Sequence, residues 1–165
     1  AKAYRALRVY EEAVGVKSDE SAKARWALWH ALDSDYWWAE FWSPLIIDMW
    51  LREAESLIAD LLQKISIVSV GVKTPLTEGS LSELEVVIGN GLDKAVKVKL
   101  SLLGLGAEVV NQACYVRVEP HSSLPLKYSV RPVTWGKVVF IAIAQLNDFI
   151  ADLRIVEAQA DPRIP

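Results

Sequence analysis

The first third of the chain carries its apolar residues at helical spacing. One series, with steps of three or four residues, opens the chain: Ala3, Leu7, Tyr10 and Val14. A second series follows Ser18, a suitable N-cap, and places large side chains on one face, which Leu28 and Ala31 widen: Trp26, Trp29, Leu32 and Tyr36. Because residues at this period line one side of a helix, we predict two amphipathic helices that bury these sides.

A third helix is predicted to begin at Ser43-Pro44, since proline is tolerated in the first helical turn. Its apolar positions form a heptad-like seam: Ile47, Leu51, Ala54, Ile58, Leu61 and Ile65. We interpret the seam as packing against the two preceding helices. An intermolecular helix seam is the alternative that the pattern leaves open.

Aromatic residues are concentrated in this helical part, where six of the seven tryptophans lie within 25 consecutive residues. Successive helical residues point about 100° apart, so Trp37 and Trp38 cannot face the same partner. Part of this surface therefore needs a cover: the rest of the chain, a second subunit, lipid headgroups or a stacked sugar ring. Nearby acidic residues disfavour anionic lipid. We predict an interface formed by Trp37, Trp38, Phe41, Trp42 and Trp50.

After Lys64 the pattern changes to short strands separated by turn residues. Seven of the eight glycines and six of the seven prolines occur in this second part, a shift typical of a change in structural class. Seven strands are predicted, at 65–73, 82–89, 94–103, 107–119, 124–131, 137–145 and 149–157. The predicted fold is α+β: a tryptophan-rich three-helix region at 1–66, an antiparallel Ig-like β-sandwich at 67–158 and a C-terminal tail at 159–165.

Charged residues alternate with apolar ones in two of these strands. Glu83 and Glu85 lie in one strand, and Lys97 and Lys99 lie in the next. Residues 89–93 have the composition of a tight turn, so we expect the two strands to pair. The glutamates and lysines would then lie opposite one another on the solvent face.

Three runs in this second part resemble a known family: LEVVIGNGLDKAVKVKL at 84–100, VEPHSSL at 118–124 and GKVVFIAIA at 136–144. They are similar to the CARDB/NEW3-type Ig-like (fibronectin-III-like) domains of prokaryotic cell-surface proteins. In that family one strand ends in Asn-x-Gly and a later one at a Pro-Gly-Ser-like turn, where this chain has His121 in place of the glycine. The resemblance implies an adhesive, spacer or assembly module at the cell surface, without catalytic residues.

Side chains suited to catalysis or metal binding are few. The only histidines and cysteine are His30, His121 and Cys114, too few for a zinc site within one chain. We interpret His30 as making a local helix contact with Asp33 or Ser34, His121 as a solvated turn residue and Cys114 as a small buried side chain.

The acidic residues fit the same interpretation. Asp33 and Asp35 lack the glycine and distal glutamate of a calcium loop and are interpreted as the polar end of a helix. Glu11 and Glu12 are interpreted as a solvated helix face. No catalytic site, metal or cofactor is predicted, so the chain is expected not to be an enzyme.

Charge and hydropathy exclude further classes. With 18 basic against 21 acidic residues, the formal net charge of −3 disfavours a nucleic-acid partner. No run of 18 apolar residues occurs, so no transmembrane span is predicted.

The resulting hypothesis is a non-enzymatic, secreted structural subunit of a cell-surface layer or extracellular filament. It would self-assemble through the aromatic helical region, as a homo-oligomer or with other surface-protein subunits. Two alternatives remain open: a carbohydrate-binding or adhesion module with exposed tryptophan platforms, and an intracellular helical adaptor.

Overall fold

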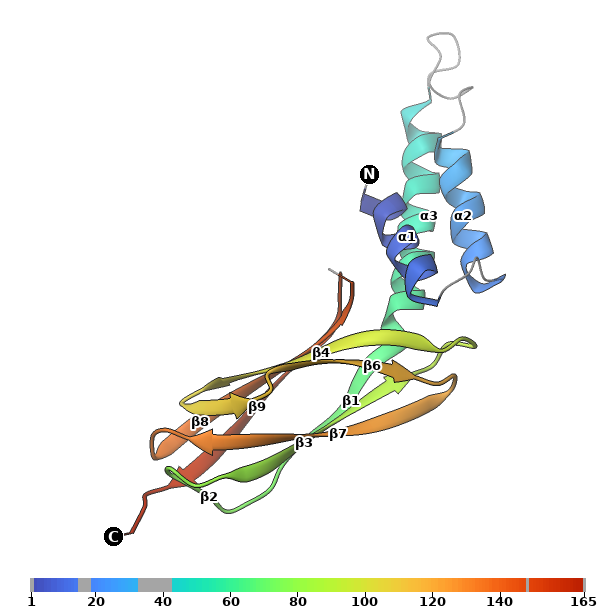
Figure 1. The fold of residues 1–165 in the computed structure, drawn as a ribbon. Coiled ribbons are helices and arrows are strands. Elements are labelled where there is room, and N and C mark those ends of the chain that lie inside the picture. The colour runs from blue at the N-terminus through green and yellow to red at the C-terminus, as the bar shows by residue number, and fades with distance from the viewer. Residues whose placement is uncertain (1, 15–18, 33–42, 148, 165) are drawn as a thin grey trace. The chain divides into compact units, whose positions relative to one another are not determined.

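The structure is a computed structural model that describes residues 2–14, 19–32, 43–147 and 149–164. The chain divides into two compact units, Ala1–Lys64 and Ile65–Pro165 (Figure 1). Within the described residues the first unit contains three helices and the second contains nine strands in two sheets. The fold is therefore α+β, as predicted.

The three predicted helices are present as α1 (Lys2–Val14), α2 (Asp19–Ala31) and α3 (Pro44–Gln63). The long helix α3 contacts both α1 and α2. Four positions of its seam are buried: Ile47, Ala54, Ile58 and Leu61. The seam thus packs within the helical unit, as we interpreted it from the sequence.

The buried face of α2 differs in part from the prediction, which placed Leu28 and Ala31 correctly but not the largest side chains. Its buried side chains are small or medium in size: Ser21, Ala24, Ala27, Leu28 and Ala31. Trp26, Trp29 and Leu32, which were expected to face the core, are 54, 64 and 59% exposed. Both faces of α2 are apolar, and the alanine-rich one packs because it allows close helix–helix approach. The tryptophans are left outside.

A partly buried ion pair joins α1 to α2. Glu11 Oε1 accepts hydrogen bonds from Arg25 Nε at 3.0 Å and from the Ser21 hydroxyl at 3.2 Å. The side chains of Glu11 and Arg25 are only 10 and 18% exposed. The prediction of a solvated face is therefore wrong for Glu11, because the partner that shields it lies on the next helix. Glu12 pairs with Arg8 on the exposed side.

The second unit is a two-layer β-sandwich (Figure 1). One sheet has the order β1-β3-β7-β5 and the other β2-β9-β8-β4-β6. The strands are β1 (Ile65–Val72), β2 (Leu76–Thr77), β3 (Ser82–Asn90), β4 (Val96–Leu105), β5 (Ala107–Val110), β6 (Ala113–Val118), β7 (Ser122–Pro132), β8 (Gly136–Leu146) and β9 (Phe149–Asp161). Alternate residues of β3, β4 and β8 fill the space between the sheets, and the largest of them is Phe140, which is fully buried.

The described residues form nine strands where seven were predicted. The segment predicted as one strand at 107–119 is two strands in different sheets, β5 and β6, because the chain turns at Asn111 with a left-handed φ of 56°. The short strand β2 pairs in parallel with Ala160 and Asp161 of β9, so the sandwich is not wholly antiparallel. Strand β9 continues to Asp161, into the segment predicted as a tail.

The predicted pairing of β3 with β4 is wrong. Strand β3 pairs with β1 and β7, whereas β4 pairs with β6 and β8, so residues 91–95 cross from one sheet to the other. The glutamate–lysine ladder therefore does not form. Glu83 instead lies 3.1 Å from Nζ of Lys127 on β7.

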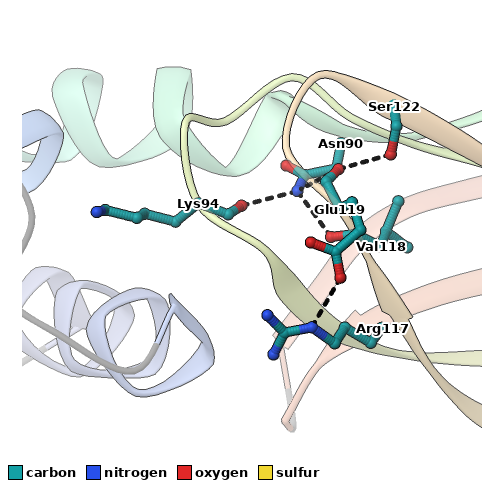
Figure 2. Close-up of polar contacts among 6 residues, drawn as sticks. All are labelled: Asn90, Lys94, Arg117, Val118, Glu119 and Ser122. Atoms are coloured by element: carbon teal, nitrogen blue, oxygen red, sulfur yellow. Dashed lines mark hydrogen bonds and ion pairs between the residues drawn. The ribbon is translucent and has the colours of Figure 1, made fainter.

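Asn90 holds this crossing in place (Figure 2). Asn90 is buried, with only 3% of its surface exposed. Its Nδ2 donates to the carbonyl oxygens of Lys94, Val118 and Glu119 at 2.8, 3.0 and 3.2 Å. Its Oδ1 accepts a hydrogen bond from the Leu92 N–H at 2.9 Å. One amide thus joins the end of β3 to the end of β6 in the opposite sheet.

Asp152 joins the sheets at the β1 edge. The register of β9 against β8 shifts between Ala144 and Gln145, and Asp152 lies beside this irregularity. Its Oδ2 accepts a hydrogen bond from the Ile67 N–H of β1 at 2.8 Å, and its Oδ1 accepts one from Leu153. A carboxylate therefore satisfies a backbone donor of β1 across the sandwich.

We predict that Asn90→Ala destabilises the sandwich by about 2 to 4 kcal/mol, because it leaves buried carbonyl groups without a donor. Urea unfolding followed by hydrogen-exchange mass spectrometry of β3 and β7 peptides measures this unit separately from the helices. The exposed Gln159→Ala is the control and is expected to change little. Equal unfolding midpoints for the two variants would contradict the role given to Asn90.

Candidate interaction surface

Large apolar side chains are exposed on all three helices. Those more than half exposed are Tyr4, Trp26, Trp29, Leu32, Leu45 and Met49. A small helical unit has limited capacity to bury a second apolar face, since each helix is already packed on one side. Exposed apolar groups of this size are typical of interaction sites.

Two of the tryptophans form a cluster with a histidine. The ring centroids of Trp26 and Trp50 lie 5.0 Å apart with the planes at 89°, an edge-to-face contact. The His30 ring is stacked on Trp50 at 4.8 Å and meets Trp26 edge-on at 4.2 Å. Such geometries are the favoured ones for aromatic pairs, so the three rings hold one another in a fixed arrangement.

This cluster borders a cavity of about 450 Å³ between α2 and α3, the α2–α3 groove. The groove is lined by Lys23, Trp26, Ala27, Met49, Trp50, Glu53 and Leu57. Its lining is mostly apolar, and the charged side chains among the lining residues are exposed. The groove can therefore accept an apolar side chain or small apolar molecule while polar groups remain at its rim.

The sequence explains why a groove forms here. The alanines of α2 bring its backbone close to α3, and the small side chain of Ala27 forms part of the lining. Trp26 and Trp50 come from the two different helices and meet edge-to-face. Small residues at the contact and large residues beside it leave a hollow between the helices.

Only one residue of the predicted interface lies in the described part of the chain. Trp50 is half-buried and lines the groove. The other four, Trp37, Trp38, Phe41 and Trp42, lie outside the described residues. The interface prediction therefore stays a prediction.

The positions of Trp26, His30 and Met49 at the groove were not predicted from the sequence. Trp26 was placed in the core, and His30 was assigned a contact with Asp33 or Ser34, both of which lie outside the described residues. The i, i+4 spacing of Trp26 and His30 does indicate that they share a helix face. Their contact with Trp50 depends on tertiary packing and leaves no local signal.

The remaining candidate groups have structural contacts in the sandwich. His121, which has a left-handed φ of 49°, places Nε2 2.5 Å from Oδ1 of Asp93 in an exposed turn. Cys114 is half-buried, with Sγ 3.4 Å from the Tyr128 hydroxyl. Burial raises the pKa of Tyr128 far above its ordinary value, and the contact with Cys114 adds to the shift. Tyr128 thus stays neutral and can donate to the Leu100 carbonyl at 3.3 Å, which joins β7 to β4.

Among the residues described, no group of three or more histidine, cysteine or acidic side chains is arranged to hold a metal ion. The predicted polar helix end at Asp33 and Asp35 lies outside that part of the chain. In the described segments, no helix has both the length and the apolar character needed to cross a membrane.

No protein-family model and no curated protein matches the sequence. Among solved structures, the chain is similar in fold to the CARDB domain of a Pyrococcus furiosus protein, determined in complex with di-metal ions. That match has a TM-score of 0.47 and 13% identity, and covers 59% of this chain and 90% of the other. The CARDB family is also the one whose motifs the sequence of residues 67–158 resembles.

Two glycoside hydrolases of family 2 also contain a similar region. A β-glucuronidase matches with a TM-score of 0.45 and 9% identity, over 59% of this chain and 13% of the enzyme. An enzyme from Bacteroides cellulosilyticus DSM 14838 matches with a TM-score of 0.45 and 13% identity, over 58 and 15% of the two chains. This chain therefore spans only a small fraction of either enzyme, and these similarities transfer no ligand or activity.

The α2–α3 groove is expected to bind an apolar fluorescent dye such as 8-anilinonaphthalene-1-sulfonate, whose rings fit the apolar lining and whose sulfonate is attracted by Lys23. Met49→Glu places a charge in the lining and should weaken binding about tenfold or more, as measured by fluorescence titration. Leu45→Glu is the matched control, because Leu45 is 82% exposed on the same helix and outside the lining. Equal dye affinity in both variants would show that the groove is not the binding site.

Proposed function

We propose that the chain is a non-enzymatic structural subunit of a cell-surface layer or extracellular filament. Its helical unit contacts neighbouring subunits through the exposed tryptophans and the α2–α3 groove, and its β-sandwich serves as a spacer. The observation that carries this proposal is the exposure of Trp26, Trp29 and Met49, each more than half accessible, beside an open apolar groove.

The energetics favour a macromolecular cover for this surface. Burial of apolar area contributes about 25 cal/mol per Å², so the exposed part of one tryptophan contributes roughly 2 to 3 kcal/mol when a partner covers it. Tryptophans in pockets are the residues that most often dominate binding energy at protein interfaces. Two such side chains together contribute roughly 4 to 6 kcal/mol towards the cost of association, and a side chain inserted in the groove adds to this.

The geometry of the α2–α3 groove favours a protein side chain over a sugar ring. A sugar platform needs a flat, exposed ring face with hydrogen-bonding groups around it. Trp26 and Trp50 instead meet each other edge-to-face, and the face of Trp50 stacks on His30. The lining of the groove offers few polar groups, whereas an inserted leucine or aromatic side chain would meet apolar surface on both helices.

Two further features support the proposal. The resemblance of residues 67–158 to CARDB/NEW3-type domains, which occur in prokaryotic cell-surface proteins, supports an extracellular or cell-surface location. Both histidines make contacts that account for them without catalysis: His30 between two indole rings and His121 with Asp93. These contacts support a non-enzymatic role.

The test is the concentration dependence of assembly size for the full chain, measured by light scattering coupled to gel filtration and by negative-stain microscopy. We expect the wild type to form oligomers in the micromolar range. The double variant Trp26→Ser/Trp29→Ser should weaken association about 100-fold or more, since it removes two large apolar contacts.

Trp135→Ser is the matched control, because Trp135 is 68% exposed but belongs to the sandwich. It is expected to assemble as the wild type does. A wild type that stays monomeric at several hundred micromolar would refute the proposal, and so would a Trp26/Trp29 double variant that assembles normally. A glycan that shifts tryptophan fluorescence of the wild type but not of the double variant would favour the carbohydrate-binding alternative.

A further inference from the structure

Strand β8 is apolar on both of its faces along its middle. Its inward residues, which include Phe140 and Ala142, are buried between the sheets. Its outward residues Val139, Ile141 and Ile143 are also aliphatic. By contrast, β3 and β7 present charged residues outward, Glu83 and Lys127 among them. A strand that is apolar on both faces is typical of a sheet covered on both sides.

The neighbouring strands extend this outward surface into a continuous patch. Across β4, β8 and β9, Leu103 is paired with Ile141, which is paired with Ile155. In the next row, Ile143 is paired with Leu153. Directly paired residues of antiparallel strands point to the same side of a sheet. We name this surface the aliphatic face, defined by Leu103, Leu105, Ile141, Ile143, Leu153 and Ile155.

The aliphatic face has polar residues at both ends. At one end the Nζ atom of Lys137 lies 2.6 Å from a carboxylate oxygen of Glu157, on adjacent strands. At the other end Lys99 is paired with Gln145. An apolar centre with a polar rim is the usual composition of a protein interface.

The size of the aliphatic face matches one side of a dimer interface. Its four most accessible residues, Leu103, Leu105, Leu153 and Ile155, are 42, 60, 43 and 62% exposed. Together they present on the order of 400 Å² of mostly apolar surface, which is within the range of the largest patch on a typical monomer. A standard interface buries about 800 Å² on each partner, of which roughly 450 Å² is non-polar. The aliphatic face and its rim together supply about this much non-polar surface.

We infer that the aliphatic face packs against the same face of a second copy of this chain. A pleated sheet surface is well covered by another sheet, and two sheets pack about 10 Å apart at about −30° with their aliphatic side chains interdigitated. Beside the six aliphatic residues the centre of this surface has one hydroxyl, that of Ser101, which is paired with Ile143. The aliphatic residues themselves offer no hydrogen-bonding group for a sugar and no charge for a nucleic acid. The same face of a second copy is matched in both shape and chemistry, and two-fold symmetry closes the pair.

This inference goes beyond the proposed function, because the aliphatic face lies in the sandwich and does not involve the helical surface. A subunit with one self-complementary surface stops at a dimer. A subunit with a second contact elsewhere can join such dimers into a larger array. The aliphatic face would supply a contact of this kind in a layer or filament of this subunit.

The test uses the full chain in the Trp26→Ser/Trp29→Ser background, where the helical contact is removed. In sedimentation experiments we expect a dimer in this background. Addition of Ile155→Glu should raise the dimer dissociation constant about 100-fold or more, because two charges are then buried in each symmetric contact. Ile155→Thr, which suits a strand, should weaken the dimer less and guards against misfolding of the charged variant.

Leu81→Glu is the matched control, since Leu81 is 60% exposed in the same unit but outside the aliphatic face, and it should leave the dimer unchanged. Hydroxyl-radical footprinting should show Leu153 and Ile155 modified in the dilute monomer and protected in the dimer. Three outcomes overturn the inference: a background variant that is monomeric at several hundred micromolar, a dimer insensitive to Ile155→Glu, or residues already protected in the monomer, which would mean that the chain covers its own face.

The same series separates this inference from the proposed function. If Trp26→Ser/Trp29→Ser leaves assembly unchanged while Ile155→Glu abolishes it, the helical contact fails and the aliphatic face stands. If the Trp26→Ser/Trp29→Ser variant abolishes all association, the helical contact stands and the aliphatic face fails.

Discussion

The β-sandwich depends on the hydrogen bonds of Asn90, which hold the chain where it leaves one sheet for the other. After β3 the backbone crosses to β4 through residues 91–95, and the crossing exposes carbonyl groups that no strand can pair. The buried amide of Asn90 donates to one of them, that of Lys94, and to the carbonyls of Val118 and Glu119 at the end of β6, and it accepts from Leu92. A leucine or valine of similar size would fill the space but leave these groups unsatisfied. The arrangement of β4, and hence of the aliphatic face beyond it, follows from this crossing.

Local pattern was enough to predict the element types. The three helices and most strands were correct because each has a clear period of 3.6 or 2 residues and ends at proline, glycine or polar residues. What failed depended on partners distant in sequence. Residues 84–100 have the composition of a hairpin, yet β3 and β4 belong to different sheets. The side chain of Asn90 pairs with backbone groups where the chain crosses between the sheets, so no hairpin turn is needed to pair them. The break at Asn111 was missed because the alternation on either side of it is continuous.

The candidate surface was predictable only in part. The prediction of more aromatic surface than one helix face can bury rested on Trp37 and Trp38, which lie outside the described residues, whereas Trp26 and Trp29 are exposed and Trp50 lines a groove. The sequence also contained two apolar faces on α2, one of tryptophans and one of alanines. Hydrophobicity favoured the tryptophans for the core, whereas close packing against α3 favoured the alanines. Periodicity cannot decide between two apolar faces of the same helix, since both have the same period. The smaller volume of the alanine side chains determines which face of α2 is buried.

The same reasoning connects the two surfaces of this chain. In each unit, one apolar face is buried in the core and a second is exposed. The exposed faces are the tryptophan face of α2 and the outward face of β8. Exposed aliphatic and aromatic groups on this scale lower solubility in a monomer, so they persist where a partner covers them. The two surfaces belong to separate compact units, so each contact uses its own set of residues. Two self-complementary contacts per subunit give an extended assembly, and a single self-complementary contact gives a closed pair. The number of surfaces that are active, rather than the strength of either, therefore determines whether the copies form a dimer or a continuous array.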